Sequence, residues 1–170
     1  MIQALGVTGA TPGAGMKTIG LIGGMSWEST VPYYRLINET VKEQLGGLRS
    51  AKLVLYSIDL HEIEELQRRG DWETAGLALA NAARSLEAAG ASFLVLCTNI
   101  MHKVAHYIEA AVAIKLLHIA DPTATEIKKS GHSVVGLLGT RFTMEQAFYK
   151  ARLFERHGLQ VKVPASHDRD

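Results

Sequence analysis

The sequence predicts an α/β protein, with a three-layer αβα arrangement in which helices cover both faces of a parallel sheet. Short apolar runs alternate with longer segments of helical period, which is the pattern of βα units. Apolar residues make up 47% of the chain and charged residues 21%, a balance typical of a globular domain and not of a disordered segment. No apolar run reaches the ~18 residues of a membrane span.

The first residues differ in composition from the rest of the chain. Residues 1–15 are rich in glycine, alanine and threonine, and they lack the basic start and long apolar stretch of a secretory signal. We expect residues 1–15 to be a disordered extension, or an upstream start added to a chain whose natural beginning is Met16.

Six apolar runs are predicted to be strands, the last of them being the weakest. They are Thr18–Ile22, Leu53–Ser57, Phe93–Cys97, Leu116–Ile119, Val134–Leu138 and Gln160–Val163.

Helix signals fall between these runs. A helix is predicted over Ser29–Leu45, with Pro32 in its first turn and glycines after its end. Three more follow from an N-terminal cap and a terminal glycine. They run from Asp71 to Ala89, from Asp121 to Gly131, and from a capping box at Thr143–Gln146 to Gly158.

The order of these elements predicts two similar domains. Residues 16–120 supply four strands and form a complete first α/β domain. Residues 121–170 begin a second domain that we expect to be incomplete, because two strands and one long helix are too little to bury both faces of a sheet.

Charge and cysteine content limit the partners and the compartment. The 18 basic and 17 acidic residues are interleaved without a basic stripe, so no nucleic-acid partner is expected. No membrane partner is expected either, and a small-molecule ligand is favoured. The single cysteine cannot form an intrachain disulfide, which favours the cytoplasm.

In an open α/β sheet, ligands bind at the carboxyl ends of the strands. After the first strand, paired glycines lead into Met25 and Ser26, and this turn allows backbone N–H groups to approach a carboxylate or phosphate. The alternative is a turn that only needs small residues.

The third strand ends at a thiol. Cys97 is followed by Thr98 and Asn99, whose polar side chains suit a substrate carboxylate. A helix N-terminus lowers the pKa of a thiol, so the position predicts a reactive thiolate. The alternative is a buried core cysteine.

A third strand end carries Thr140 and Thr143, whose hydroxyls could bind an anionic substrate. Arg141 is interpreted as solvent-exposed. His102 and His106 have a metal-ligand spacing, but Lys103 stands where a zinc-protease motif has glutamate, so no metal site is predicted.

Three segments in series resemble the aspartate/glutamate racemase family, and the resemblance spans Met16 to Arg169. They are the stretch from Met16 through the first glycine-rich turn to Thr30, Leu-Cys-Thr-Asn-Ile-Met-His-Lys around Cys97, and Leu-Leu-Gly-Thr-Arg-Phe-Thr-Met-Glu-Gln-Ala-Phe-Tyr after residue 136.

The resemblance implies two similar α/β domains with an active site between them and cofactor-independent chemistry, without pyridoxal phosphate or metal. One cysteine removes the α-proton of an aspartate- or glutamate-like amino acid, and a second delivers a proton to the opposite face. Cys97 matches the first cysteine. The substrate-binding positions would be Met25, Ser26, Thr98, Asn99, Thr140 and Thr143.

Two departures bear on activity. Ile100 stands where this branch often has threonine, and the chain ends before the motif of the second cysteine. Losing a positioned acid or base costs about 10² to 10⁴ in rate. Three alternatives stay open: an inactive remnant, an amino-acid-binding half-domain, and, ranked last, a single-cysteine enzyme similar to a decarboxylase. A homodimer is also left open.

Overall fold

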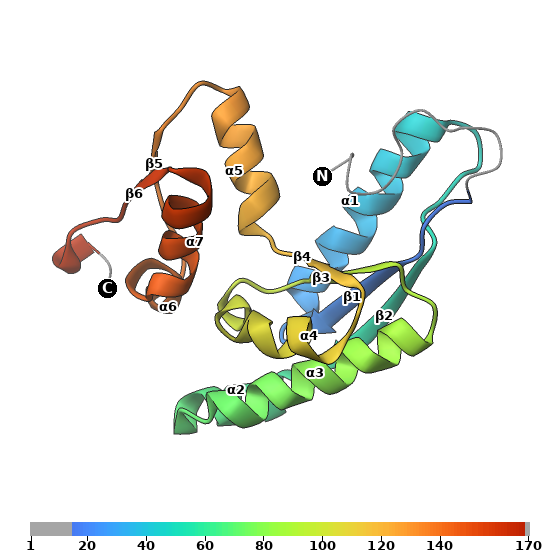
Figure 1. The fold of residues 1–170 in the computed structure, drawn as a ribbon, viewed down its shortest axis with the longest axis horizontal. Coiled ribbons are helices and arrows are strands. Elements are labelled where there is room, and N and C mark those ends of the chain that lie inside the picture. Colours follow the sequence, from blue (N-terminus) through green and yellow to red (C-terminus); the bar gives the residue numbers. More distant parts are fainter. Residues whose placement is uncertain (1–14, 169–170) are drawn as a thin grey trace. The chain divides into compact units, whose positions relative to one another are not determined.

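The computed structural model describes residues 15–168, which divide into two compact units (Figure 1). The first unit ends at Leu117 and the second begins at His118. Apart from Gly15, the predicted N-terminal extension lies outside the described residues.

The first unit is built on a four-stranded parallel sheet. Its strand order is β2-β1-β3-β4, so consecutive strands are connected by crossovers. The strands are β1 (Ile19–Gly24), β2 (Leu53–Ile58), β3 (Phe93–Leu96) and β4 (Lys115–Leu117).

Helices cover both faces of this sheet, and two separate core clusters mark the two faces. On one face, Leu21 and Phe93 pack with Ile37 of the long first helix. On the other face, Ile22 and Leu94 pack with the third and fourth helices. The helical elements are α1 (Trp27–Leu45), α2 (Leu60–Arg69), α3 (Trp72–Ala88), the 3₁₀ turn η2 (Ile100–Val104) and α4 (Ala105–Ala111).

Successive residues of one strand therefore pack on opposite faces of the sheet, because side chains alternate along a strand. The predicted α/β class, with a parallel sheet between helices, is confirmed.

The second unit is smaller. Its two parallel strands carry half-exposed side chains, and its core gathers Ala120, Ala124, Tyr149, Leu153 and Leu159. Its elements are α5 (Ala120–Lys129), β5 (Val134–Gly136), α6 (Arg141–Glu145), α7 (Ala147–His157), β6 (Gln160–Lys162) and the 3₁₀ turn η3 (Ser166–Asp168).

Two predicted helix starts are wrong. The N-cap of α5 is Ile119, which leaves Asp121 inside the first turn, where its carboxylate pairs with side chains of α7. The N-cap of α6 is Thr140 and not Thr143, because the Thr140 hydroxyl accepts from the backbone N–H of Thr143. The helix then breaks at Gln146, whose backbone is extended (ψ 150°).

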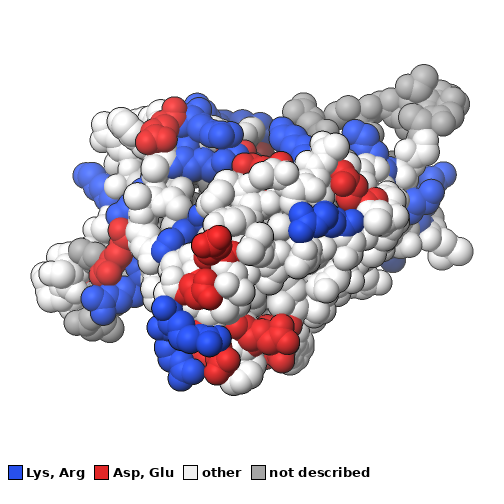
Figure 2. All heavy atoms as spheres, turned by 60° about the horizontal axis from the view of Figure 1, so that its bottom comes forward, with Lys and Arg blue, Asp and Glu red and all other residues white. Residues whose placement is uncertain are grey.

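Charges are mixed on the face drawn in Figure 2, where basic and acidic side chains lie interspersed. Among the described residues, no helix is long and apolar enough to cross a membrane.

Candidate active site

The candidate site in the first unit lies where β1 and β3 end side by side. The two strands are paired in register up to Ile22 and Leu96. The backbone N–H of Cys97 extends this ladder by donating to the carbonyl of Ile22 at 2.9 Å. The loops after β1 and β3 therefore begin at adjacent points on the same edge of the sheet.

The loop after β1 is held by close packing against β2. Gly24 has a φ of +70°, and a Cβ there would lie 2.0 Å from the carbonyl oxygen of Ile58. Met25 also has a positive φ, 61°, and its N–H donates to that carbonyl at 3.2 Å. This region is sparsely populated for residues that carry a Cβ, so the positive φ of Met25 indicates a backbone held in place by its surroundings.

A buried hydroxyl fixes the same turn from the helix side. Thr30, on α1, accepts from the N–H of Gly24 at 3.0 Å and donates to the carbonyl of Ser26 at 3.3 Å. The Met25 side chain is buried in the core cluster on the α3 face, so this residue presents its backbone to the edge of the sheet.

The N-terminus of α1 opens at this edge. Ser26 is the N-cap, but its side chain makes no capping bond and instead lies 3.3 Å from the Ser29 hydroxyl. The first N–H groups of a helix lack intrahelical partners and attract anions. This 19-residue helix therefore offers N–H groups to a carboxylate next to the Cys97 loop.

The Cys97 thiol is buried and packs in the core cluster on the α1 face of the sheet. Burial raises the pKa of the thiol to about 12, because a thiolate is poorly solvated there. This result contradicts the expected low pKa. The segment after Cys97 is a short 3₁₀ turn, not a long helix whose dipole could offset the cost of burial.

The two polar residues after Cys97 lie at the surface of the edge. Thr98 is half-buried and Asn99 is exposed. His102 is buried, and its Nδ1 atom lies 2.7 Å from the carbonyl oxygen of Thr98. This contact holds the loop that follows Cys97 against the interior of the first unit. Among the described residues, no three His, Cys, Asp or Glu side chains gather as a metal site would require.

In the second unit, the loop after β5 brings the two predicted threonines together. The hydroxyl oxygens of Thr140 and Thr143 lie 3.2 Å apart, with Thr140 exposed and Thr143 buried. Arg141 donates to Glu145 at 3.1 Å and is largely exposed, as expected for a solvated side chain. Of the two threonine hydroxyl groups, that of Thr140 is therefore the accessible one.

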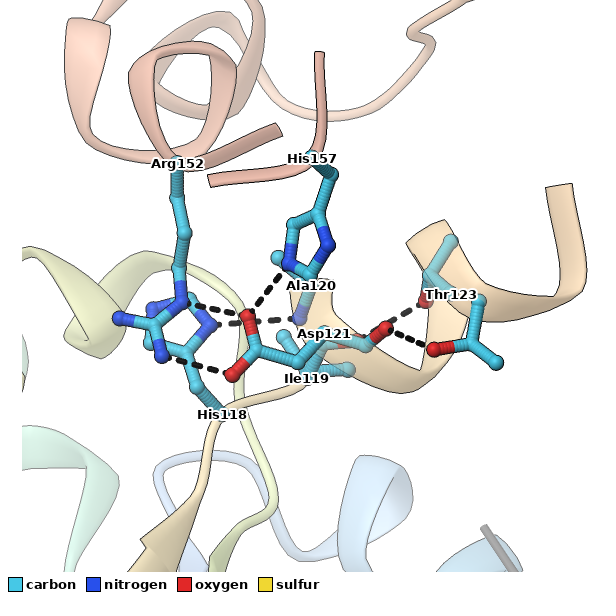
Figure 3. Close-up of polar contacts among 8 residues, drawn as sticks. His118, Ile119, Ala120, Asp121, Thr123, Arg152 and His157 are labelled. Atoms are coloured by element: carbon cyan, nitrogen blue, oxygen red, sulfur yellow. Dashed lines mark hydrogen bonds and ion pairs between the residues drawn. The ribbon is translucent and has the colours of Figure 1, made fainter. Parts of the chain in front are cut away.

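A charged cluster in the second unit was not predicted (Figure 3). Asp121 accepts from Nε and Nη2 of Arg152, both at 2.7 Å, and lies 3.0 Å from Nε2 of His157. His118, also in this view, is buried and accepts from the N–H of Ala120 through its Nδ1 atom. No local sequence signal marks this cluster, because its members come from two helices about 30 residues apart.

The end of β2 carries a further polar residue, Asp59, which the sequence analysis did not single out. Asp59 directly follows β2 and caps α2, accepting from the N–H of His61 at 3.0 Å. It lies at the same edge of the sheet as Ser26 and Cys97, since β2 is paired with β1 through Gly24 and Ile58.

The first unit is an open parallel sheet with polar loops at its carboxyl edge and a thiol at one strand end. The class is therefore an α/β protein whose carboxyl edge is a candidate ligand-binding edge. The sequence profile of the Asp/Glu/Hydantoin racemase family matches residues 22–170. The chain therefore belongs to the Asp/Glu/Hydantoin racemase family.

Individual proteins similar to this chain are also described as amino-acid racemases or their homologues. The broad specificity amino-acid racemase RacX of Bacillus subtilis is 26% identical over 146 residues, covering 84% of this chain and 63% of RacX. The crystal structure of a candidate Asp/Glu racemase from Yersinia pestis has a TM-score of 0.88 and 64% identity, covering 91% of this chain and 67% of its own.

An aspartate racemase homologue from Pyrococcus horikoshii has a TM-score of 0.81 and 38% identity, with the same two coverages of 91% and 67%. The chain thus spans about two thirds of the length of these relatives.

Proposed function

We propose that this chain carries the first half-site of a cofactor-independent amino-acid racemase, an isomerase in which Cys97 exchanges a proton with the α-carbon of an amino acid. The observation that carries the proposal is the position of the thiol, at the end of β3 and beside the turn that opens α1. Family membership supports the reaction class.

The substrate carboxylate would bind at the edge that Ser26, Thr98 and Asn99 line. The uncapped N–H groups of α1 favour an anion there, and the side chains of Thr98 and Asn99 can donate hydrogen bonds to it. A carboxylate held in this way also stabilises the negative charge that develops when the α-proton leaves.

The proton balance gives Cys97 two roles. As a thiolate it takes the α-proton and becomes a thiol, leaving a carbanion stabilised by the carboxylate. As a thiol it returns a proton to the same face. Because burial raises the thiol pKa to about 12, the neutral donor form predominates at neutral pH.

Inversion needs a second acid or base on the opposite face. Cys97 is the single cysteine of the chain, so that group is not a second thiol of this chain. We therefore propose proton exchange as the activity of this chain, and full racemisation as the activity of a site completed by a further group.

A second candidate function is amino-acid binding without catalysis. The buried thiol favours it, because a neutral, enclosed sulfur is a poor base. The cytoplasm is the proposed compartment for either function, since a lone thiol suits reducing conditions.

Protection of the thiol tests whether an amino acid binds against Cys97. Alkylation of Cys97 by iodoacetamide is followed by mass with and without a saturating amino acid, and with the matched amine that lacks the carboxylate. The proposal expects slower alkylation with the amino acid only. The reaction is run at alkaline pH, where the ligand-free chain is alkylated measurably, and equal measurable rates in all three samples would refute binding at this edge. The variant Asn99→Ala should weaken the protection. The control variant Asn81→Ala, on the exposed side of α3, should leave it unchanged.

A further inference from the structure

The first strands of the two units have matching sequences. Strand β1 reads Ile-Gly-Leu-Ile-Gly-Gly over Ile19–Gly24, and residues 135–140, in and directly after β5, read Val-Gly-Leu-Leu-Gly-Thr. In both units a helical segment then leads to a parallel partner strand, β2 in the first unit and β6 in the second. The second unit therefore repeats the strand-helix-strand start of the first unit.

One face of this repeat is packed in both units. Leu21 packs with Ile37 of α1. Its counterpart Leu137 packs against the cluster that contains Tyr149 and Leu153 of α7. Because side chains alternate along a strand, the residues on either side of these two leucines point to the opposite face.

That opposite face is filled in the first unit and bare in the second. Ile22 is fully buried there, whereas its counterpart Leu138 is 77% exposed. Val134, on the same face as Leu138, is 43% exposed. The second unit therefore leaves apolar side chains uncovered where the first unit buries them.

A pair of glycines shows what covers this face in the first unit. A Cβ at Gly20 would lie 2.7 Å from a methyl carbon of Leu94 on β3 and 3.3 Å from the Cβ of Leu86 on α3. A Cβ at its counterpart, Gly136, would have nothing within 4 Å. The close approach that requires a glycine is thus made by a strand and a helix in the first unit, and no described residue makes it in the second.

A free strand edge accompanies the bare face. Strand β1 lies between β2 and β3, whereas β5 pairs with β6 alone among the described residues. Residues 133–140 include no Lys, Arg, Asp or Glu side chain that would discourage a further strand. Strand β5 therefore has a free edge and a bare face, the two surfaces that β3 and α3 cover at β1.

The length of the relatives indicates what covers these two surfaces. The Yersinia pestis structure shares 64% identity with this chain but is matched over 67% of its length, so about a third of it has no counterpart here. We propose that β5 binds that third when it is supplied as a separate polypeptide, through a parallel strand on the free edge and a helix on the bare face. An aliphatic side chain of the strand lies over Gly136, as Leu94 lies over Gly20. This binding depends on packing and not on proton transfer by Cys97.

Co-expression tests the assignment. The full chain, carrying an affinity tag, is produced in one cell with the unmatched third of the Yersinia pestis protein as an untagged second polypeptide, and the purified material is quantified by mass spectrometry and light scattering. Gly136→Val adds a side chain where the chain alone has open space, and Leu138→Lys places a charge on the bare face. Gly15→Val is the matched control, because a Cβ at Gly15 in the first unit also has nothing within 4 Å.

The wild type and Gly15→Val should retain the second polypeptide in a stoichiometric complex. Gly136→Val and Leu138→Lys should each retain about tenfold less, while the melting temperature of each variant alone stays within about 3 °C of the wild type. A wild type that purifies without the second polypeptide, or full retention by both Gly136→Val and Leu138→Lys, would overturn the proposal. A wild-type chain that instead forms a dimer, lost in these two variants, would also overturn it and assign the face to a second copy.

Discussion

Asp121 and Arg152 form a two-pronged ion pair, in which Nε and Nη2 of the guanidinium each donate to one carboxylate oxygen at 2.7 Å. The pair joins the first turn of α5 to the middle of α7, and both side chains are partly buried. His157, at the end of α7, adds a contact of 3.0 Å to the same carboxylate. Removing one partner leaves the other charge in a poorly solvated place.

Arg152→Leu should therefore loosen α5 and α7 without unfolding the first unit. Charged hydrogen bonds of this kind contribute about 1.5 to 3 kcal/mol, so hydrogen-exchange protection in both helices should fall about ten- to a hundredfold. Mass spectrometry of α5 and α7 peptides measures it. The control Lys129→Gln breaks the exposed pair with Glu126 on α5 and should change protection by twofold or less. Similar effects of the two variants would contradict the account.

The same carboxylate predicts a loss of stability in acid. The bonds from Arg152 hold the pKa of Asp121 well below its ordinary value of 3.8, with burial opposing them and His157 adding to them. A lowered folded-state pKa gives stability that is complete above the unfolded pKa and is lost as pH falls through the folded value. The second unit should thus weaken progressively below about pH 4.

Urea unfolding, followed by NMR signals of α5 and α7 between pH 6 and pH 3, checks this pH dependence. Asp121→Asn should be less stable at pH 6 and should show a smaller further loss in acid. If the wild type and Asp121→Asn lose stability in parallel below pH 4, another carboxyl group is responsible.

Gly24 should be the most sensitive glycine of the candidate site. An alanine there would place a Cβ against the carbonyl of Ile58, in addition to the cost of a positive φ. Gly70, at the end of α2, has a φ of +72° and a ψ of 13°, which is the left-handed conformation, and a Cβ there would have nothing within 4 Å, so it shows the cost of a positive φ without a clash.

We expect Gly24→Ala to lower the free energy of unfolding by about 3 kcal/mol or more, and Gly70→Ala by about 1 kcal/mol. Denaturant unfolding, followed by the fluorescence of Trp27 and Trp72 in the first unit, measures both. Equal losses would mean that the turn relaxes away from β2.

The sequence was sufficient to place all six strands, because each is a short apolar run whose side chains are needed on the faces of a sheet. It also predicted Asp71 as a cap, which the contact with the Thr74 N–H confirms. Capping at Thr143 failed because Thr140 competes for the same helix start, three residues earlier. Sequence spacing alone does not decide between two threonines that can each cap.

The chemical state of the site was harder to predict than its position. Cys97 stands at a strand end, as predicted, but its pKa depends on the α1 side chains that pack over it. The position of Asp59 depends on the strand order, since β2 reaches the candidate edge only by pairing with β1. The ion pair of Asp121 likewise requires two helices to meet. All three depend on tertiary packing, which local patterns do not encode.

The most direct test of the account is α-proton exchange in deuterated water. Each enantiomer of lysine, glutamine and aspartate is incubated with the full chain, deuterium uptake is followed by mass, and the enantiomeric ratio by chiral chromatography. Because Cys97 reaches one face of the α-carbon, we predict uptake into one enantiomer with retained configuration, at a rate that rises with pH as the thiolate forms, and its loss in Cys97→Ala. Absence of uptake in every amino acid across the pH range, or uptake that persists in Cys97→Ala, would contradict the assignment of Cys97 as the proton-transferring group.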